Sequence, residues 1–130
     1  MLGALGFLPP TPLIDADIMR TTLHSVLGEW DWKTTWGWDY PLIAMTAARL
    51  GLGEMAFDSL LLDSPKNRYL PNGHNYQDAR LPLYLPGNGG LLAAIALLCT
   101  ATQPDGIQQA EGHFKMGQWV MNWENLCSLH

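Results

Sequence analysis

We predict an all-α fold from three features of the sequence. Apolar residues recur at helical spacing in four segments, and glycines, prolines or capping acids bound these segments. Four prolines between residues 64 and 87 exclude a helix or a central strand there. One segment near the C-terminus alternates apolar and polar residues, as a β-strand does. We therefore expect about four helices, a long irregular loop and a C-terminal β-strand or extended tail.

The first three helices follow from caps and breaks. Asp15 or Asp17 can cap a helix that runs to about Leu27, where Gly28 stops it. The apolar face of this helix is formed by Ile18, Met19, Leu23, Val26 and Leu27. A second helix is expected over residues 41–50, because its leading proline suits a first turn, and a third over residues 54–62. Only "GLG" separates the second and third helices, so they should form an antiparallel hairpin.

The fourth helix and the tail leave the fold open-ended. The helix "NGGLLAAIALLCTA" starts near Asn88 and is apolar nearly all round, so it should be buried on most sides. A polar linker, "TQPDGIQQAEG", follows, and then a single strand in "GQWVMNWENL". A lone strand needs a sheet to join. We expect residues 1–102 to be part of a larger helical domain and residues 103–130 to be a linker and the start of a β-segment.

Composition excludes several classes of function. The net charge is −5, with seven basic residues in 130 and no basic cluster, so we expect no nucleic-acid partner and no membrane partner. The apolar start lacks a basic n-region and a cleavage motif, so we expect no signal peptide, and the localisation stays open. Cys99 and Cys127 lack C-x-x-C spacing, and no histidine has a partner at ligand spacing. We therefore expect no metal and no cofactor.

The stretch "EWDWKTTWGWDYP", residues 29–41, holds four of the six tryptophans beside three acids. All four share one parity, so in an extended chain they would face one side. Core packing explains two of them, and we expect at least one, Trp36 or Trp38, to line a ligand cleft. Asp39 either caps the next helix or is a carboxylate in an aromatic pocket, where burial favours the protonated form and suits a general acid.

The long loop, residues 69–92, is rich in amides and tyrosines but carries little charge. That mixture suits neutral hydroxylated ligands such as sugars. His74 is either a general base or donor, or a loop histidine held by its neighbours. Asn75 is a candidate sugar ligand, and Asn88 either caps the fourth helix or also contacts the ligand. Glycoside hydrolysis needs two carboxylates, and Glu29, Asp31 and Asp78 are open alternatives for the second.

Three segments carry a resemblance: "WKTTWGWDYPLIAMTAARLG", "LPNGHNYQ" and "LYLPGNGGLLAAIALL". They resemble the C-terminal part of the catalytic domain in six-hairpin glycoside hydrolases, (α/α)6 toroids with the active site at the loop-rich end. Within that class the chain is most similar to bacterial secreted or periplasmic enzymes, distantly similar to inverting α-L-fucosidases. The likeness covers residues 1–100 and implies a partial toroid, with about four helices in hairpins and a carbohydrate as the partner.

The resemblance has two departures. Relatives carry I-D-G-N-x-G at the glycine-rich turn, and this chain has Pro86 at the position of their catalytic aspartate, although Asn88 matches the asparagine. A complete toroid also needs many more helices. The resemblance therefore implies a fragment that contributes part of a sugar cleft and is inactive or nearly so alone. Its expected site residues are Asp39 as the catalytic acid and Trp36, Trp38, His74, Asn75 and Asn88 as substrate ligands.

Two alternatives remain open at this point. One is a small non-catalytic carbohydrate-binding or interaction protein that self-associates through its exposed apolar faces. The other is a remnant without a stable fold, which would aggregate through its fourth helix and its apolar N-terminus.

Overall fold

The computed structural model describes residues 1–101, 111–116 and 119–124. Helices make up about half of these residues, which confirms the mostly helical class. The described helices are α1 (Gly3–Gly6), α2 (Ala16–Glu29), α3 (Asp39–Arg49), α4 (Gly53–Leu60) and α5 (Leu85–Ala101). The described strands form two antiparallel pairs, β1 (Arg68–Tyr69) with β2 (Asn75–Tyr76) and β3 (Glu111–Met116) with β4 (Trp119–Glu124).

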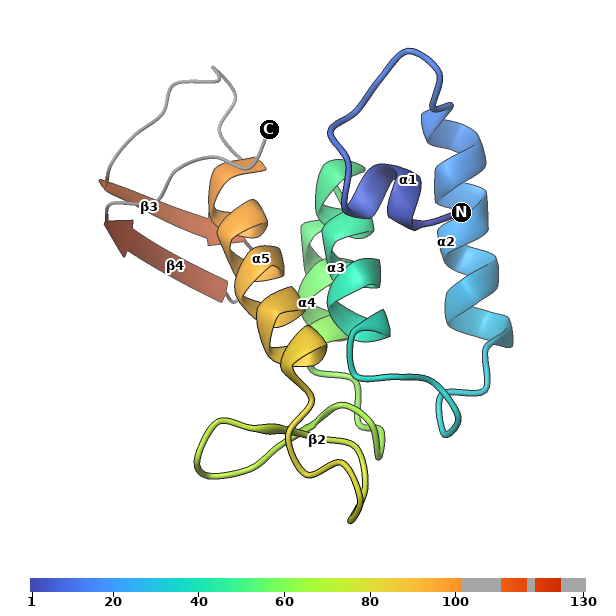
Figure 1. Cartoon of the computed structure of the whole chain (residues 1–130). Helices are drawn as coiled ribbons and strands as arrows, with labels where there is room; N and C mark the ends of the chain where they lie inside the picture. The colour runs from blue at the N-terminus through green and yellow to red at the C-terminus, as the bar shows by residue number, and fades with distance from the viewer. Residues whose placement is uncertain (102–110, 117–118, 125–130) are drawn as a thin grey trace.

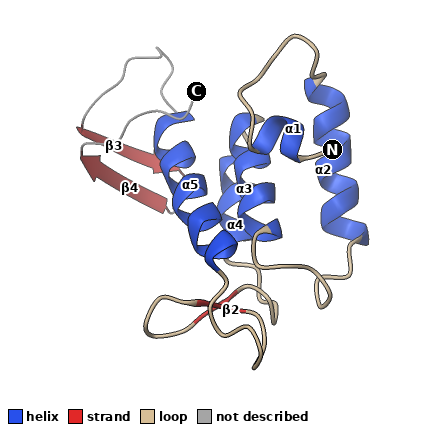
Figure 2. Ribbon diagram, in the orientation of Figure 1, coloured by secondary structure: helices blue, strands red, loops and turns tan. Residues whose placement is uncertain are grey.

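The α3–α4 hairpin stands at the centre, with α5 on one side and α1 and α2 on the other (Figure 1). A short turn at residues 50–52 joins α3 to α4, as the sequence predicts. The two long connections that flank this hairpin, residues 30–38 and 61–84, lie together at the opposite end of the helices (Figure 2). We call this end the loop end. It is where the candidate site residues gather.

The first long helix begins where its cap predicts. Asp15 Oδ1 accepts hydrogen bonds from Asp17 N at 2.8 Å and from Ile18 N at 3.0 Å, so Asp15 is the cap. The buried face of α2 consists of Met19, Leu23 and Val26. Ile18 is exposed, because it lies about 100° around the helix from Met19, off the face that the buried residues share.

The uncharged N-terminus folds into α1, a single turn that the sequence did not indicate. Leu2 and Leu5 are buried in the core cluster, and α1 packs on α3. Thr46 of α3 lies beneath this turn, with its hydroxyl 3.4 Å from the Leu2 carbonyl oxygen. The apolar start of the chain is therefore covered by α3, the first helix of the hairpin.

The helix predicted from residue 88 starts three residues earlier, at Leu85. Pro86 is the second residue of α5, where its missing N–H costs no helical hydrogen bond. Asn88 therefore lies inside the first turn, and its prediction as the cap is wrong. Leu97 and Leu98 of α5 are buried, whereas Leu92 and Ile95 are exposed. The expectation of burial on most sides fails along this exposed stripe.

The predicted C-terminal strand is confirmed as β4, but it is not alone. Its residues alternate as expected, with Met121 and Trp123 less exposed than their neighbours. β3 pairs with it in register, and Phe114 lies opposite Met121. Glu111 and Gly112, which the sequence analysis assigns to a polar linker, belong to β3. The sequence does not indicate this strand, because it has too few apolar residues to show an alternation. Residues 102–110 of that linker lie outside the described residues.

Leu98 and Leu92 provide a matched test of where the core lies. Leu98 is fully buried and Leu92 is 70% exposed, on the same helix. We predict that Leu98→Ala lowers the free energy of unfolding by about 2–5 kcal/mol, since it leaves a cavity. Leu92→Ala should change it by less than about 0.5 kcal/mol. Urea unfolding followed by circular dichroism measures both, and equal effects would contradict this placement of α5.

Candidate functional site

Two buried amides, Asn75 and Gln77, connect the segments of the loop end. Their exposed fractions are 0% and 4%. Gln77 Nε2 donates to Asn75 Oδ1 at 2.8 Å and to the Lys66 carbonyl at 3.1 Å. Gln77 Oε1 accepts from Gly37 N at 3.0 Å. One side chain therefore joins the turn before α3 to the start of the long loop.

Asn75 extends the same network to α5. Its Nδ2 donates to the Lys66 and Arg68 carbonyls, each at 3.3 Å. Its backbone N donates to Asn88 Oδ1 at 2.9 Å, and Asn88 Nδ2 donates to the Gly73 carbonyl at 2.7 Å. Asn88 therefore fastens the first turn of α5 to the β1–β2 hairpin. Asn75 lies beneath the surface of the loop end, and its amide is fully used inside the protein.

The backbone approaches this amide pair at two glycines. A Cβ built on Gly37 or on Gly87 would overlap Asn75 Oδ1. Any larger residue at either position would push apart the turn before α3, the hairpin and α5. The "WGW" and "PGN" glycines of the sequence are thus required by close packing around Asn75.

Above this layer lies a half-exposed aromatic surface, which we call the Trp36 surface. It consists of Trp36, Asp39, Lys66 and Tyr84. The Trp36 ring is 49% exposed, and its centroid lies 5.6 Å from that of Tyr84. Asp39 Oδ2 accepts from Trp36 N at 2.8 Å, and Lys66 Nζ lies 5.9 Å from the Trp36 ring centroid. An aromatic face, a carboxyl group and an ammonium group therefore lie side by side.

The remaining tryptophans do not share this surface. The stretch is turned rather than extended, so its common parity does not align the rings. Trp30 contacts Trp32, which contacts the buried Tyr40 at 5.5 Å between ring centroids. Trp38 stacks instead on Phe7 at 6.2 Å and keeps part of its ring exposed. The four rings thus divide among three separate groups: Trp30 with Trp32, Trp36 with Tyr84, and Trp38 with Phe7.

Burial and charge set the protonation of the site. Burial raises the pKa of Asp39, and the hydrogen bond from Trp36 N offsets only part of this rise. The pKa of Tyr84 is also raised, first by burial and then by the charge of Asp39, so the two groups interact. Asp78 behaves oppositely: the N–H of Arg80, followed by smaller contributions that include the charge of Lys66, lowers its pKa.

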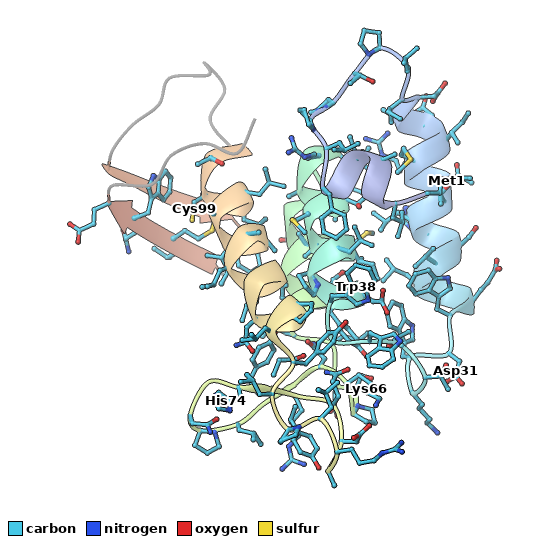
Figure 3. All side chains as sticks on the ribbon, viewed as in Figure 1. Met1, Asp31, Trp38, Lys66, His74 and Cys99 are labelled. Atoms are coloured by element: carbon cyan, nitrogen blue, oxygen red, sulfur yellow. The ribbon has the colours of Figure 1, made fainter. Side chains whose placement is uncertain are left out.

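The structure does not bring all the predicted ligands together. His74 lies at the tip of the β1–β2 hairpin, on the opposite side of the loop end from Asp31 and apart from Trp38 (Figure 3). Asn72 holds it: its Oδ1 accepts from His74 N at 3.1 Å, and its Nδ2 lies 3.3 Å from His74 Nδ1. His74 therefore adjoins Asn88 through the hairpin, and it does not join the Trp36 surface.

Sequence reasoning missed Lys66 and Tyr84. Lys66 stands in no motif, and Tyr84 lies in the segment "LYLPGNGGLLAAIALL" without being singled out there. Each reaches Trp36 only through the folding of the long loop. Lys66 is held there by the Gln77 carbonyl at 3.1 Å and by Asp78 Oδ2 at 3.7 Å. Among the described residues, no group of three metal-ligating side chains occurs, and no helix is long and apolar enough to cross a membrane.

No family model matches this chain, and neither a curated protein nor a solved structure matches it. We therefore infer the function from the residues of the loop end.

Gly87 and Gly89 test the packing around Asn75. We predict that Gly87→Ala lowers the free energy of unfolding by about 1–3 kcal/mol, because its methyl group would overlap Asn75 Oδ1. Gly89→Ala, on the same helix with nothing within 4 Å of its Cβ position, should raise it by about 0.5–1 kcal/mol. Urea unfolding measures both. A harmless Gly87→Ala would show that the amide pair does not fix this end of α5.

The carboxyl groups of Asp39 and Asp78 should have different pKa values. We predict by carbon NMR that the pKa of Asp39 lies above 3.8, the ordinary value, and that of Asp78 lies below it. A raised pKa means that the folded chain holds the Asp39 proton to higher pH than the unfolded chain does. The stabilisation from that proton is complete below pH 3.8 and is lost as the pH rises through the folded pKa.

Asp39→Asn removes this titration while leaving an oxygen for Trp36 N. The variant should therefore gain stability relative to the natural chain as the pH rises through the pKa of Asp39. Thermal unfolding across that range measures the difference. A constant difference, or an Asp39 pKa at or below that of Asp78, would contradict the burial of this carboxyl group.

Proposed function

We propose that the Trp36 surface is part of a carbohydrate-binding cleft of a glycoside hydrolase, and that Asp39 is its acidic group. The observation that carries the proposal is the half-exposed Trp36 ring beside the half-buried Asp39 carboxyl group. A sugar ring presents C–H groups on its face and hydroxyls at its edge. The C–H groups can pack on an aromatic face, and the hydroxyls can bind a neighbouring carboxyl or ammonium group.

The position of the surface supports this proposal. Both long connections meet at the loop end, and a short turn closes the α3–α4 hairpin at the other end. In the six-hairpin enzymes that the sequence resembles, the active site lies at the loop-rich end of the helices. We propose that α3, α4 and α5 correspond to neighbouring helices of such a toroid.

Asp39 suits the role of a general acid. Its raised pKa extends the range of pH in which it carries the proton that a leaving oxygen needs. Hydrolysis also needs a second carboxylate. Asp78 holds a turn, since its Oδ1 accepts from Arg80 N at 2.9 Å and from Leu81 N at 3.1 Å. We therefore assign only the acid role, to Asp39, and expect this chain alone to bind sugar without turnover.

The arrangement gives the other predicted ligands distinct roles in the proposal. Trp38 stacks on Phe7 outside the Trp36 surface, and His74 lies at the hairpin tip, so in this proposal neither contacts the sugar ring held at Trp36. Asn75 and Asn88 act as positioning residues, because their amides bind the backbone of the loop end.

A non-catalytic carbohydrate-binding protein that self-associates is the second candidate. The exposed stripe of α5, with Leu92 and Ile95, favours it because such a surface is a site for contact with more protein. Two results together would support this candidate over the first. The chain would assemble in a way that depends on its concentration, and it would bind sugar without hydrolysis even after the remaining helices of a toroid are supplied.

Trp36 and Trp30 form a matched pair for the binding test. We predict that Trp36→Ala weakens binding of its best ligand, chosen from a panel of neutral oligosaccharides and L-fucosides, roughly tenfold or more, because an aromatic stacking face is lost. Trp30→Ala removes a ring of similar exposure outside the surface and should leave affinity unchanged. Isothermal titration measures both. No binding by the folded natural chain, or equal losses in both variants, would overturn the proposal.

A further inference from the structure

A second, separate feature is an open groove of about 740 Å³ beside α4. Leu27 of α2 forms one side, and the turn and helix from Gly51 to Leu62 form the rest. Its apolar lining includes Leu52, Met55 and Leu62. Because the groove follows α4 from the turn before its first residue to just past its last, it is elongated, roughly 12 Å or more along the helix axis.

The rim of this groove carries two carboxylates. Glu54 and Asp58 are four residues apart on α4, so they stand on one face about one helical turn from each other. Both are exposed, and in the described part of the chain neither forms a salt bridge with lysine or arginine. The only hydroxyl in the lining, that of Ser59, already donates to the Met55 carbonyl at 2.7 Å. The groove thus offers an apolar floor and an acidic edge.

We propose that this groove binds an amphipathic helix with a basic edge, supplied by a partner protein. An apolar stripe on the incoming helix would cover Leu52, Met55 and Leu62. Lysines or arginines four residues apart on its flank would meet Glu54 and Asp58, since both helices repeat at the same pitch. A second copy of this chain is the less favourable occupant, because its net charge of −5 brings acids toward an acidic rim.

A charge exchange tests this proposal. The probe is a synthetic helix of about 15 residues, long enough to be helical when bound, with a leucine stripe flanked by lysines. A second probe replaces the lysines with glutamates. The variant Glu54→Lys with Asp58→Lys should weaken binding of the lysine peptide roughly tenfold or more and create binding of the glutamate peptide.

The matched control is Glu29→Lys with Glu124→Lys. It changes the net charge by the same amount at two exposed acids outside the groove lining. The control should bind the lysine peptide within about threefold of the natural chain, because neither changed acid lines the groove and exposed charges outside it are screened by salt. Isothermal titration measures affinity, and circular dichroism measures the helix formed on binding. All variants replace exposed side chains, and their own dichroism checks that they fold.

Three results would overturn the proposal. They are the absence of lysine-peptide binding to the folded natural chain, equal losses in the groove variant and the control, and a dimer of the natural chain that the groove variant abolishes. The last result would identify a second copy as the occupant. The proposal does not depend on the carbohydrate site, so sugar binding by the groove variant should remain unchanged whichever result is obtained.

Discussion

The hydrogen bond between Asn75 and Gln77 is the interaction on which the loop end depends. Both ends of the Gln77 amide are hydrogen-bonded: its oxygen accepts from Gly37 N, and its nitrogen donates to the Asn75 side chain and to nearby carbonyls. A buried amide that loses a partner costs about 1–3 kcal/mol, so the connected set resists partial opening. Three pieces of chain that are remote in sequence, namely the turn before α3, the β1–β2 hairpin and the start of α5, meet at this pair. A loop of twenty-odd residues, whose described strands are two residues long, is thereby held in place by side-chain amides.

The Trp36 surface is a consequence of that arrangement. Gly37 N donates to Gln77, and the backbone N of the neighbouring Trp36 donates to Asp39. The Lys66 carbonyl accepts hydrogen bonds from the Asn75 and Gln77 amides, and its ammonium group lies near the Trp36 ring. The buried layer is neutral and fully bonded, whereas the surface above it carries a carboxyl group of raised pKa, an ammonium group and a half-exposed ring. Rigid support below a polar aromatic face is the arrangement expected of a binding site rather than of a core.

The sequence predicted the helices well because their signals are local. Asp15 capped its helix as expected, and the short "GLG" break produced the α3–α4 hairpin. Single-turn α1 and the weakly patterned β3 gave no such signal. The site is harder to predict from sequence, because Lys66 and Tyr84 meet Trp36 only through long-range packing. The polarity of Asn75 makes it a candidate ligand, but polarity does not distinguish an amide that faces a ligand from one that fills the interior. The parity of the four tryptophans misled for a related reason: it holds for an extended chain, and this stretch turns.

The most direct test of the account is a titration of the isotope-labelled chain with neutral sugars, followed by NMR at the six tryptophan indole N–H groups. We predict that the Trp36 signal shifts in a saturable way, together with the backbone signals of Asp39 and Tyr84. The signal of Trp32, whose indole N–H is bonded to the Leu27 carbonyl, should stay in place. Shifts confined to Trp30 and Trp32, or no saturable shift with any sugar, would contradict the claim that the Trp36 surface binds carbohydrate.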